Sequence, residues 1–73
     1  MRLCDLKLGE IGKIDVIKGN EKLAKRLLAL GLIDGTDIQL KRIAPLGDPL
    51  IVSLRGFDLA IRKKDAQNIY IQK

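Results

Sequence analysis

The chain has 73 residues, of which 47% are hydrophobic, and its 14 basic and nine acidic residues give a formal net charge of +5. A chain of this length forms one domain, residues 1–73, and buries only roughly 60% of the surface that its unfolded form exposes. It has no histidine and one cysteine, Cys4, which excludes an internal disulfide and removes the commonest general base and transition-metal ligand.

Residues 3–9 carry leucines at a spacing too short for a helix and too irregular for a strand. We expect a turn or short 3-10 segment there that lays Leu3, Leu6 and Leu8 on the core. From residue 10 to Gly19, alternating residues predict a half-buried strand. The two faces of this strand are predicted to carry Ile14 and Val16 on the inside, and Lys13, Asp15 and Ile17 on the outside.

Residues 20–31 predict one helix of about ten residues, with Asn20 as its N-cap and Glu21 in its first turn. An apolar stripe at helical spacing should face the core. This stripe comprises Leu23, Ala24, Leu27, Leu28 and Leu30. Gly31 suits the left-handed position after a helix, and Leu32 would then pack back on Leu27 in a Schellman motif.

After an Asp34-Gly35 turn, residues 37–44 predict a second strand in which the alternation changes phase before Ile43. A bulge or strong twist would reconcile the two phases. Residues 49–55, 57–62 and 69–73 predict three further short strands, and residues 63–68 a single helical turn. The inward side chains of these strands are expected to be Ile38, Leu40, Leu50, Val52, Leu54, Leu59, Ile61, Ile69 and Ile71.

The second and third strands are joined by a loop that holds both prolines of the chain. Pro45 and Pro49 bracket Leu46, Gly47 and Asp48, which leaves the connection few conformations and predicts a rigid hairpin loop. Leu46 is a large apolar side chain at the tip of a turn that is normally polar. We expect it to fold back onto the barrel; the alternative is an anchor offered to a partner.

Five short strands, regular turn signals and a lone helix predict a mainly β protein with one α-helix, a small five-stranded barrel. Closure of the barrel would also remove exposed strand edges.

Catalysis is hard to build from these residues. With no histidine, one serine, one threonine and one cysteine, a nucleophile cannot be paired with a base in the usual way, and the carboxylates are dispersed over turns and caps. Cys4 and Met1 are the only soft metal ligands, and no glycine-rich phosphate loop is present. We therefore expect no enzyme, no cofactor and no metal site. No apolar run reaches the roughly 18 residues of a membrane span, so we expect no membrane insertion and a cytoplasmic location.

The positive charge favours an acidic partner, although scattered solvated lysines would explain it as well. Nucleic acid contact would be salt-dependent and unspecific, because only Phe57 and Tyr70 are available for base stacking. The remaining candidates are protein interactions through the proline loop or through the basic helix face, which is otherwise a solvated surface. The basic residues form three clusters: Lys22, Lys25 and Arg26; Lys41 and Arg42; and Arg62, Lys63 and Lys64.

Three stretches, "LKLGEIGKI", "KRLLALGLIDGT" and "APLGDPLIVSLRGFDLAIRKKDA", together resemble the FeoA family of bacterial ferrous iron uptake and cover almost the whole chain. The resemblance implies an SH3-like barrel and an accessory or regulatory role on the membrane transporter FeoB, which carries a cytoplasmic GTPase domain. It implies neither iron carriage nor catalysis. Docking is expected through the helix face, Lys22, Lys25 and Arg26, and an adjoining proline loop with Leu46.

In the family pattern Leu27, Leu28 and Gly31 form the helix and its stop, Gly35 the turn, and Pro45 to Pro49 the loop. We expect Leu27 and Leu28 to be core residues. Two alternatives stay open: a small basic nucleic-acid-binding barrel, and an iron-linked regulatory interaction domain. The second is open because FeoA-like barrels also occur as the C-terminal domains of iron-dependent repressors. A 73-residue chain that begins with methionine favours the free-standing form, and exposed aliphatic patches would equally support a homo-oligomer.

Overall fold

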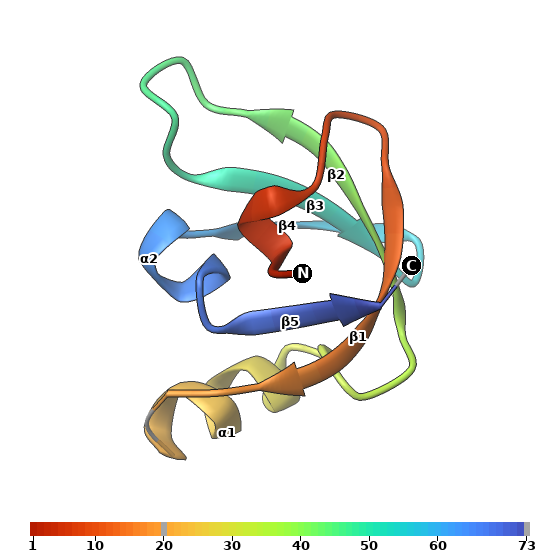
Figure 1. The fold of residues 1–73 in the computed structure, drawn as a ribbon, viewed down its shortest axis with the longest axis vertical. Helices are drawn as coiled ribbons and strands as arrows, with labels where there is room; N and C mark the ends of the chain where they lie inside the picture. Colours follow the sequence, from red (N-terminus) through yellow and green to blue (C-terminus); the bar gives the residue numbers. More distant parts are fainter. Residues whose placement is uncertain (20, 73) are drawn as a thin grey trace.

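The computed structural model describes residues 1–19 and 21–72 (Figure 1). It contains five antiparallel strands in one curved sheet with the order β4-β3-β2-β1-β5, which confirms the predicted SH3-like barrel. The strands are β1 (Ile11–Ile17), β2 (Asp37–Ile43), β3 (Leu50–Leu54), β4 (Phe57–Ile61) and β5 (Ile69–Gln72). The helical segments are a 3-10 turn η1 (Leu3–Asp5), the helix α1 (Glu21–Ala29) and the single turn α2 (Lys63–Ala66). None of these helices has the length and apolar character needed to cross a bilayer.

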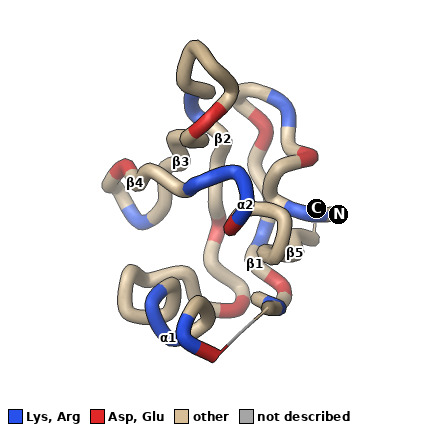
Figure 2. The backbone as a smooth tube through the Cα atoms, turned by 90° about the vertical axis from the view of Figure 1, so that its left-hand side faces the viewer, with Lys and Arg blue, Asp and Glu red and all other residues tan. Residues whose placement is uncertain are grey.

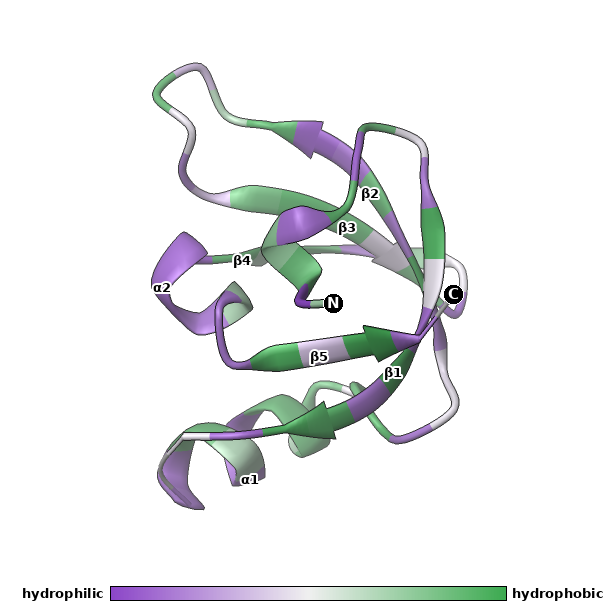
Figure 3. Ribbon diagram, in the orientation of Figure 1, coloured by the Kyte–Doolittle hydropathy of each residue, from purple (hydrophilic) through white to green (hydrophobic). Residues whose placement is uncertain are grey.

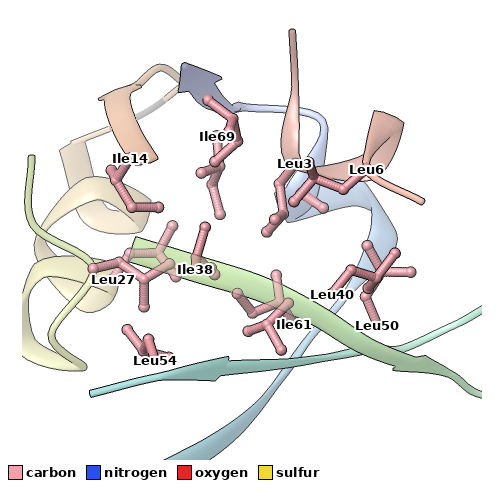
Figure 4. Packing of buried hydrophobic residues seen from close by; sticks show 14 of the residues in the cluster. Leu3, Leu6, Ile14, Leu27, Ile38, Leu40, Leu50, Leu54, Ile61 and Ile69 are labelled. Carbon is pink, nitrogen blue, oxygen red and sulfur yellow. The ribbon is translucent and has the colours of Figure 1, made fainter. Parts of the chain in front are cut away.

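The core is aliphatic, because the inward positions of the sheet carry Leu, Ile and Val. Hydrophobic and hydrophilic residues alternate along β1 and β5 (Figure 3), as a sheet with one buried face requires. Leu3 from η1, Leu6 directly after η1 and Leu27 from α1 meet the strand side chains in one cluster (Figure 4). The strand residues of this cluster are Ile14, Ile38, Leu40, Leu50, Val52, Leu54, Ile61, Ile69 and Ile71, and it also contains Leu23, Leu32 and Ala66.

Two β-bulges bend the sheet. In β2 the register shifts between Leu40 and Arg42, which confirms the predicted bulge and pairs Ile43 with buried Leu50, although Ile43 itself is exposed. In β1 a second shift lies between Ile14 and Val16, which the sequence did not predict. The extra residue reverses the alternation. Val16 is therefore exposed instead of inward, and Ile17 packs against the core instead of facing outward.

The end of α1 is the predicted Schellman motif. The Leu32 amide donates to the Leu27 carbonyl at 3.0 Å, the Gly31 amide donates to the Leu28 carbonyl at 3.0 Å, and Gly31 has φ +96°. Leu27 and Leu32 are both buried, and Glu21 lies in the first turn. The predicted N-cap, Asn20, lies outside the described residues.

The apolar stripe of α1 is narrower than predicted. Leu23 and Leu27 are buried, but Leu28 is 50% exposed and Leu30 is also exposed. Only one side of the short helix touches the barrel, and Leu28 lies roughly 100° round the helix from Leu27. The prediction that Leu28 is a core residue is therefore wrong. Leu8, also expected in the core, is exposed because residues 7–10 form a turn closed by the Glu10 amide and the Lys7 carbonyl.

The barrel leaves one sheet edge uncovered. On the outer side of β5 the Ile71 amide donates to the Met1 carbonyl at 2.7 Å, and Arg2 forms a β-bridge with Tyr70. On the other end strand, β4, no described residue takes the corresponding position. We expected barrel closure to leave no exposed strand edge. This expectation holds for β5, whose outer edge is paired, and is wrong for β4.

Gly12 allows β1 and β5 to come close together. A Cβ atom added at Gly12 would overlap Ile71 Cγ2 and lie 3.3 Å from the Gln72 carbonyl. Because Ile71 is β-branched and buried, it has little room to move. We expect Gly12→Ala to lower the free energy of unfolding by about 1–3 kcal/mol, measured by urea denaturation. Ile71→Ala should lower the free energy of unfolding by less in the Gly12→Ala protein than in the native protein, because it removes the overlap. An equal loss in both proteins would contradict the close contact.

Candidate functional site

The basic face of α1 comprises Lys22, Lys25 and Arg26, and all three side chains are exposed as predicted. Arg26 differs from the two lysines because its guanidinium Nη2 lies 2.7 Å from Asp65 Oδ2. Asp65 belongs to α2 and its side chain is only 13% exposed. The ion pair therefore links α1 to α2, and its two residues lie 39 positions apart in the sequence. No local sequence pattern predicts a contact over this distance.

A groove of about 920 Å³ separates α1 from the end of β4 and from α2. It brings together two basic clusters that are distant in sequence: Lys22 and Arg26 from α1, and Arg62 and Lys64 beside and within α2. Figure 2 shows the basic segments of α1 and α2 on the same side of the molecule. The groove also has an apolar lining, which comprises Leu23, Leu27, Leu30, Ala60 and Ile61.

The third basic cluster does not join this groove. Lys41 Nζ lies 3.1 Å from Asp58 Oδ2, so this lysine is paired within the sheet. Arg42 is exposed at the end of β2. The sequence identified each cluster, but which of them share a surface depends on the order of the strands.

The proline loop is a hairpin connection between β2 and β3, as predicted, and its rigidity stays a prediction. The Gly47 amide donates to the Ala44 carbonyl at 2.7 Å, and the Ala44 amide donates to the Pro49 carbonyl at 3.1 Å. Leu46 is 96% exposed, so the expectation that it folds back onto the barrel is wrong. The tight turn that starts at Ala44 holds Leu46 at its tip, beyond the reach of the core cluster.

Asp48 has a structural role that sequence reasoning did not specify. Its Oδ1 accepts a hydrogen bond from the Lys63 amide at 2.9 Å, and Lys63 is the first residue of α2. Asp48 thus satisfies a helix N-terminal donor from another part of the chain, as a capping side chain does. Gly35, at φ +83°, and Gly47, at φ +86°, occupy the left-handed conformations that their turns require.

The two predicted docking elements do not adjoin. The loop between β2 and β3 lies at one end of the long axis of the molecule and α1 at the other (Figure 1). Leu46 and the basic face of α1 are therefore separate surfaces. Within residues 1–19 and 21–72, no three His, Cys, Asp or Glu side chains lie close enough together to hold a metal ion.

The whole chain, residues 1–73, matches the family described as "FeoA domain". A curated relative, the Fe(2+) transport protein A/Fe(2+) transporter FeoB fusion protein of Porphyromonas gingivalis, is 31% identical over 72 residues. These residues are 99% of this chain and 8% of the fusion protein.

Two solved structures extend the comparison. FeoA of Chlorobium tepidum superposes with a TM-score of 0.92 at 33% identity, over 99% of this chain and 69% of that one. FeoA of Stenotrophomonas maltophilia, solved with zinc and described as an SH3 domain protein, superposes with a TM-score of 0.85 at 25% identity. That match covers 99% of this chain and 89% of the Stenotrophomonas chain.

The bond from the Lys63 amide to Asp48 can be tested by removing its acceptor. We expect Asp48→Ala to lower the free energy of unfolding by about 1 kcal/mol, measured by urea denaturation, because the first turn of α2 loses a cap. Amide exchange at Lys63 should accelerate. Asp48→Asn keeps an acceptor oxygen and serves as the matched control. Equal losses for the two variants would show that the hydrogen bond is not the source of the effect.

Proposed function

Because this chain belongs to the FeoA family, we propose that it is an accessory and regulatory protein of bacterial ferrous iron uptake that docks on the cytoplasmic part of a FeoB-like transporter. The observation that carries the proposal is the Porphyromonas fusion, in which an FeoA segment and the FeoB transporter share one polypeptide. A covalent link holds two modules at a high effective concentration. The link indicates that the two modules act together, and an FeoA domain that is not fused to the transporter would need a binding surface for this contact.

The basic face of α1 is the surface that we propose for this encounter. Among the described residues, neither Lys22 nor Lys25 takes part in an ion pair, so both present their charge to solvent. Exposed ion pairs contribute only about 0.2–1 kcal/mol each, but a patch of one sign accelerates and orients association. An acidic face on the transporter's GTPase-containing portion is the complement that this patch requires.

Leu46 is the second contact that we propose. Its side chain is almost fully exposed, and the hydrogen bonds of the loop hold it in place. An apolar anchor on a rigid loop loses little conformational entropy when a partner covers it. Since the loop and α1 lie at opposite ends of the molecule, the partner has to contact it at two places (Figure 1).

Charge reversal on the helix tests the first contact. We expect Lys22→Glu with Lys25→Glu to weaken retention by the immobilised cytoplasmic domain of a FeoB-like transporter at least tenfold, measured by biolayer interferometry. Arg26 is left native, because its reversal would place a second carboxylate beside Asp65. Lys7→Glu with Arg42→Glu makes the same change in net charge on exposed residues outside α1. Equal weakening by both pairs would remove α1 as the docking face.

Leu46→Ser tests the second contact by separating stability from binding. The free energy of unfolding should change by less than about 0.5 kcal/mol, because the side chain is already in solvent. Retention by the same transporter domain should fall. Leu8→Ser, another exposed leucine in a turn, is the matched control. Native retention by the Leu46 variant would exclude the loop from the interface.

A further inference from the structure

We infer that the free edge of β4 binds an extended, acidic peptide segment, which joins the sheet as an additional strand and lies in the groove beside α1. This inference goes beyond the proposed function, because it fixes the conformation and chemistry of the bound segment and does not depend on which protein carries it. Peptide binding and retention by a transporter domain can also fail independently.

The register of the β3–β4 hairpin shows which backbone groups of β4 are free. Leu54 pairs with Phe57, and the two intervening residues, Arg55 and Gly56, have φ of 50° and 83°. Two residues with positive φ form a type I′ turn, whose flanking pair is hydrogen-bonded. Hydrogen-bonded and outward positions alternate along an antiparallel strand. Asp58 and Ala60 therefore direct their N–H and C=O groups away from β3.

These outward groups form a template for strand addition. β4 is an end strand of the sheet, with β3 as its one neighbour. At the other end of the sheet the protein already uses this mode, since Met1 and Arg2 pair with the outer side of β5. An unpaired edge of this kind recruits extended chains by main-chain hydrogen bonds, while side-chain pockets supply selectivity.

The groove supplies an apolar lining beside this edge. Ala60 and Ile61 line it from β4, Leu23 and Leu27 from α1, and Leu30 from the turn directly after α1. Beyond Leu30, a Cβ atom added at Gly31 would lie 3.9 Å from Phe57 Cζ, so the Phe57 ring lies near the C-terminal end of α1. The volume of about 920 Å³ falls within the range of roughly 300–1,000 Å³ that is typical of binding clefts.

The charges of the groove select an acidic occupant. Lys22, Arg26, Arg62 and Lys64 line it. Among the described lining residues the one acidic side chain, Asp65, is already paired with Arg26. Carboxylates on an added strand would meet this basic rim (Figure 2), while the apolar residues that alternate with them face the leucines of α1.

The same charges argue against the other occupants. A second copy that paired through its own β4 would bring two basic grooves together, and each chain carries a net charge of +5. A nucleic acid offers no peptide groups to the Asp58 and Ala60 edge. A single-stranded nucleic acid would also need aromatic side chains on which its bases could stack, and no aromatic residue is among the described residues that line the groove. Tyr70 is instead in contact with Lys18, whose Nζ lies 4.9 Å from the ring centroid.

The direct test titrates the isotope-labelled protein with a nine-residue peptide of alternating glutamate and valine, acetylated and amidated at its ends. We expect the largest amide shifts at Asp58 and Ala60, and at least tenfold slower hydrogen exchange of both amides in the complex. Binding should weaken with added salt. A peptide with lysine for glutamate, and one methylated at the backbone nitrogens that face β4, should each bind at least tenfold more weakly.

Two variants locate the site on the protein. Ala60→Pro removes one outward N–H at a position where an edge strand tolerates proline, and it should weaken peptide binding at least tenfold. Ala60→Ser keeps the N–H and is its matched control. Lys64→Glu changes the basic rim without touching the sheet or α1. It should weaken binding about fivefold, and it keeps the test decisive if the proline variant does not fold.

Four results would overturn the inference. They are shifts confined to the basic side chains with none at Asp58 and Ala60, unchanged affinity for the methylated peptide, slow exchange of the two amides in a dimer without peptide, or the same perturbation by a single-stranded oligonucleotide. Each of them leaves retention by the transporter domain as a separate measurement.

Discussion

The structure depends on one small aliphatic core that a single five-stranded sheet has to enclose. Among residues 1–19 and 21–72, no aromatic side chain belongs to this core, so branched aliphatic residues fill it. The bulges at Ile14 to Val16 and at Leu40 to Arg42 help the sheet to curve. η1 and the residue after it contribute Leu3 and Leu6 to this core, and α1 contributes Leu23 and Leu27. In a domain of this size each of these side chains is a large part of the stability.

The same curvature arranges the outer surfaces. The connection through α2 returns the chain from β4 to β5 and carries Asp65 to within 2.7 Å of Arg26. This places a basic helix, a basic turn and an uncovered sheet edge around one groove. It also leaves the proline loop at the opposite end, where Leu46 stands in solvent. The molecule therefore presents two separate surfaces with different chemistry, one charged and grooved and one apolar and projecting.

Patterns of local origin were predicted well. The Schellman motif follows from Gly31 and Leu32, and the β2 bulge from the phase change before Ile43. The errors have one physical source, which is that burial depends on what packs opposite a residue. Val16 and Ile17 exchanged faces because the bulge in β1 is set by pairing with β5. Leu28 looked like part of an apolar stripe, yet its side chain is 50% exposed, because no part of the chain that the structure describes covers that side of α1 closely.

By itself, the sequence determined the strand and helix segments, the aliphatic composition of the core, the turn chemistry and the excess of positive charge. These depend on interactions within a few residues or on composition, and they also carry the resemblance to the FeoA family. Only the tertiary structure decided that Lys22 shares a groove with Lys64 and that Arg26 forms an ion pair with Asp65. It also decided that Asp48 caps α2 and that β4 has an unpaired edge among the described residues. These features require residues far apart in the chain to meet, and the order of the strands, which no local pattern encodes, brings them together.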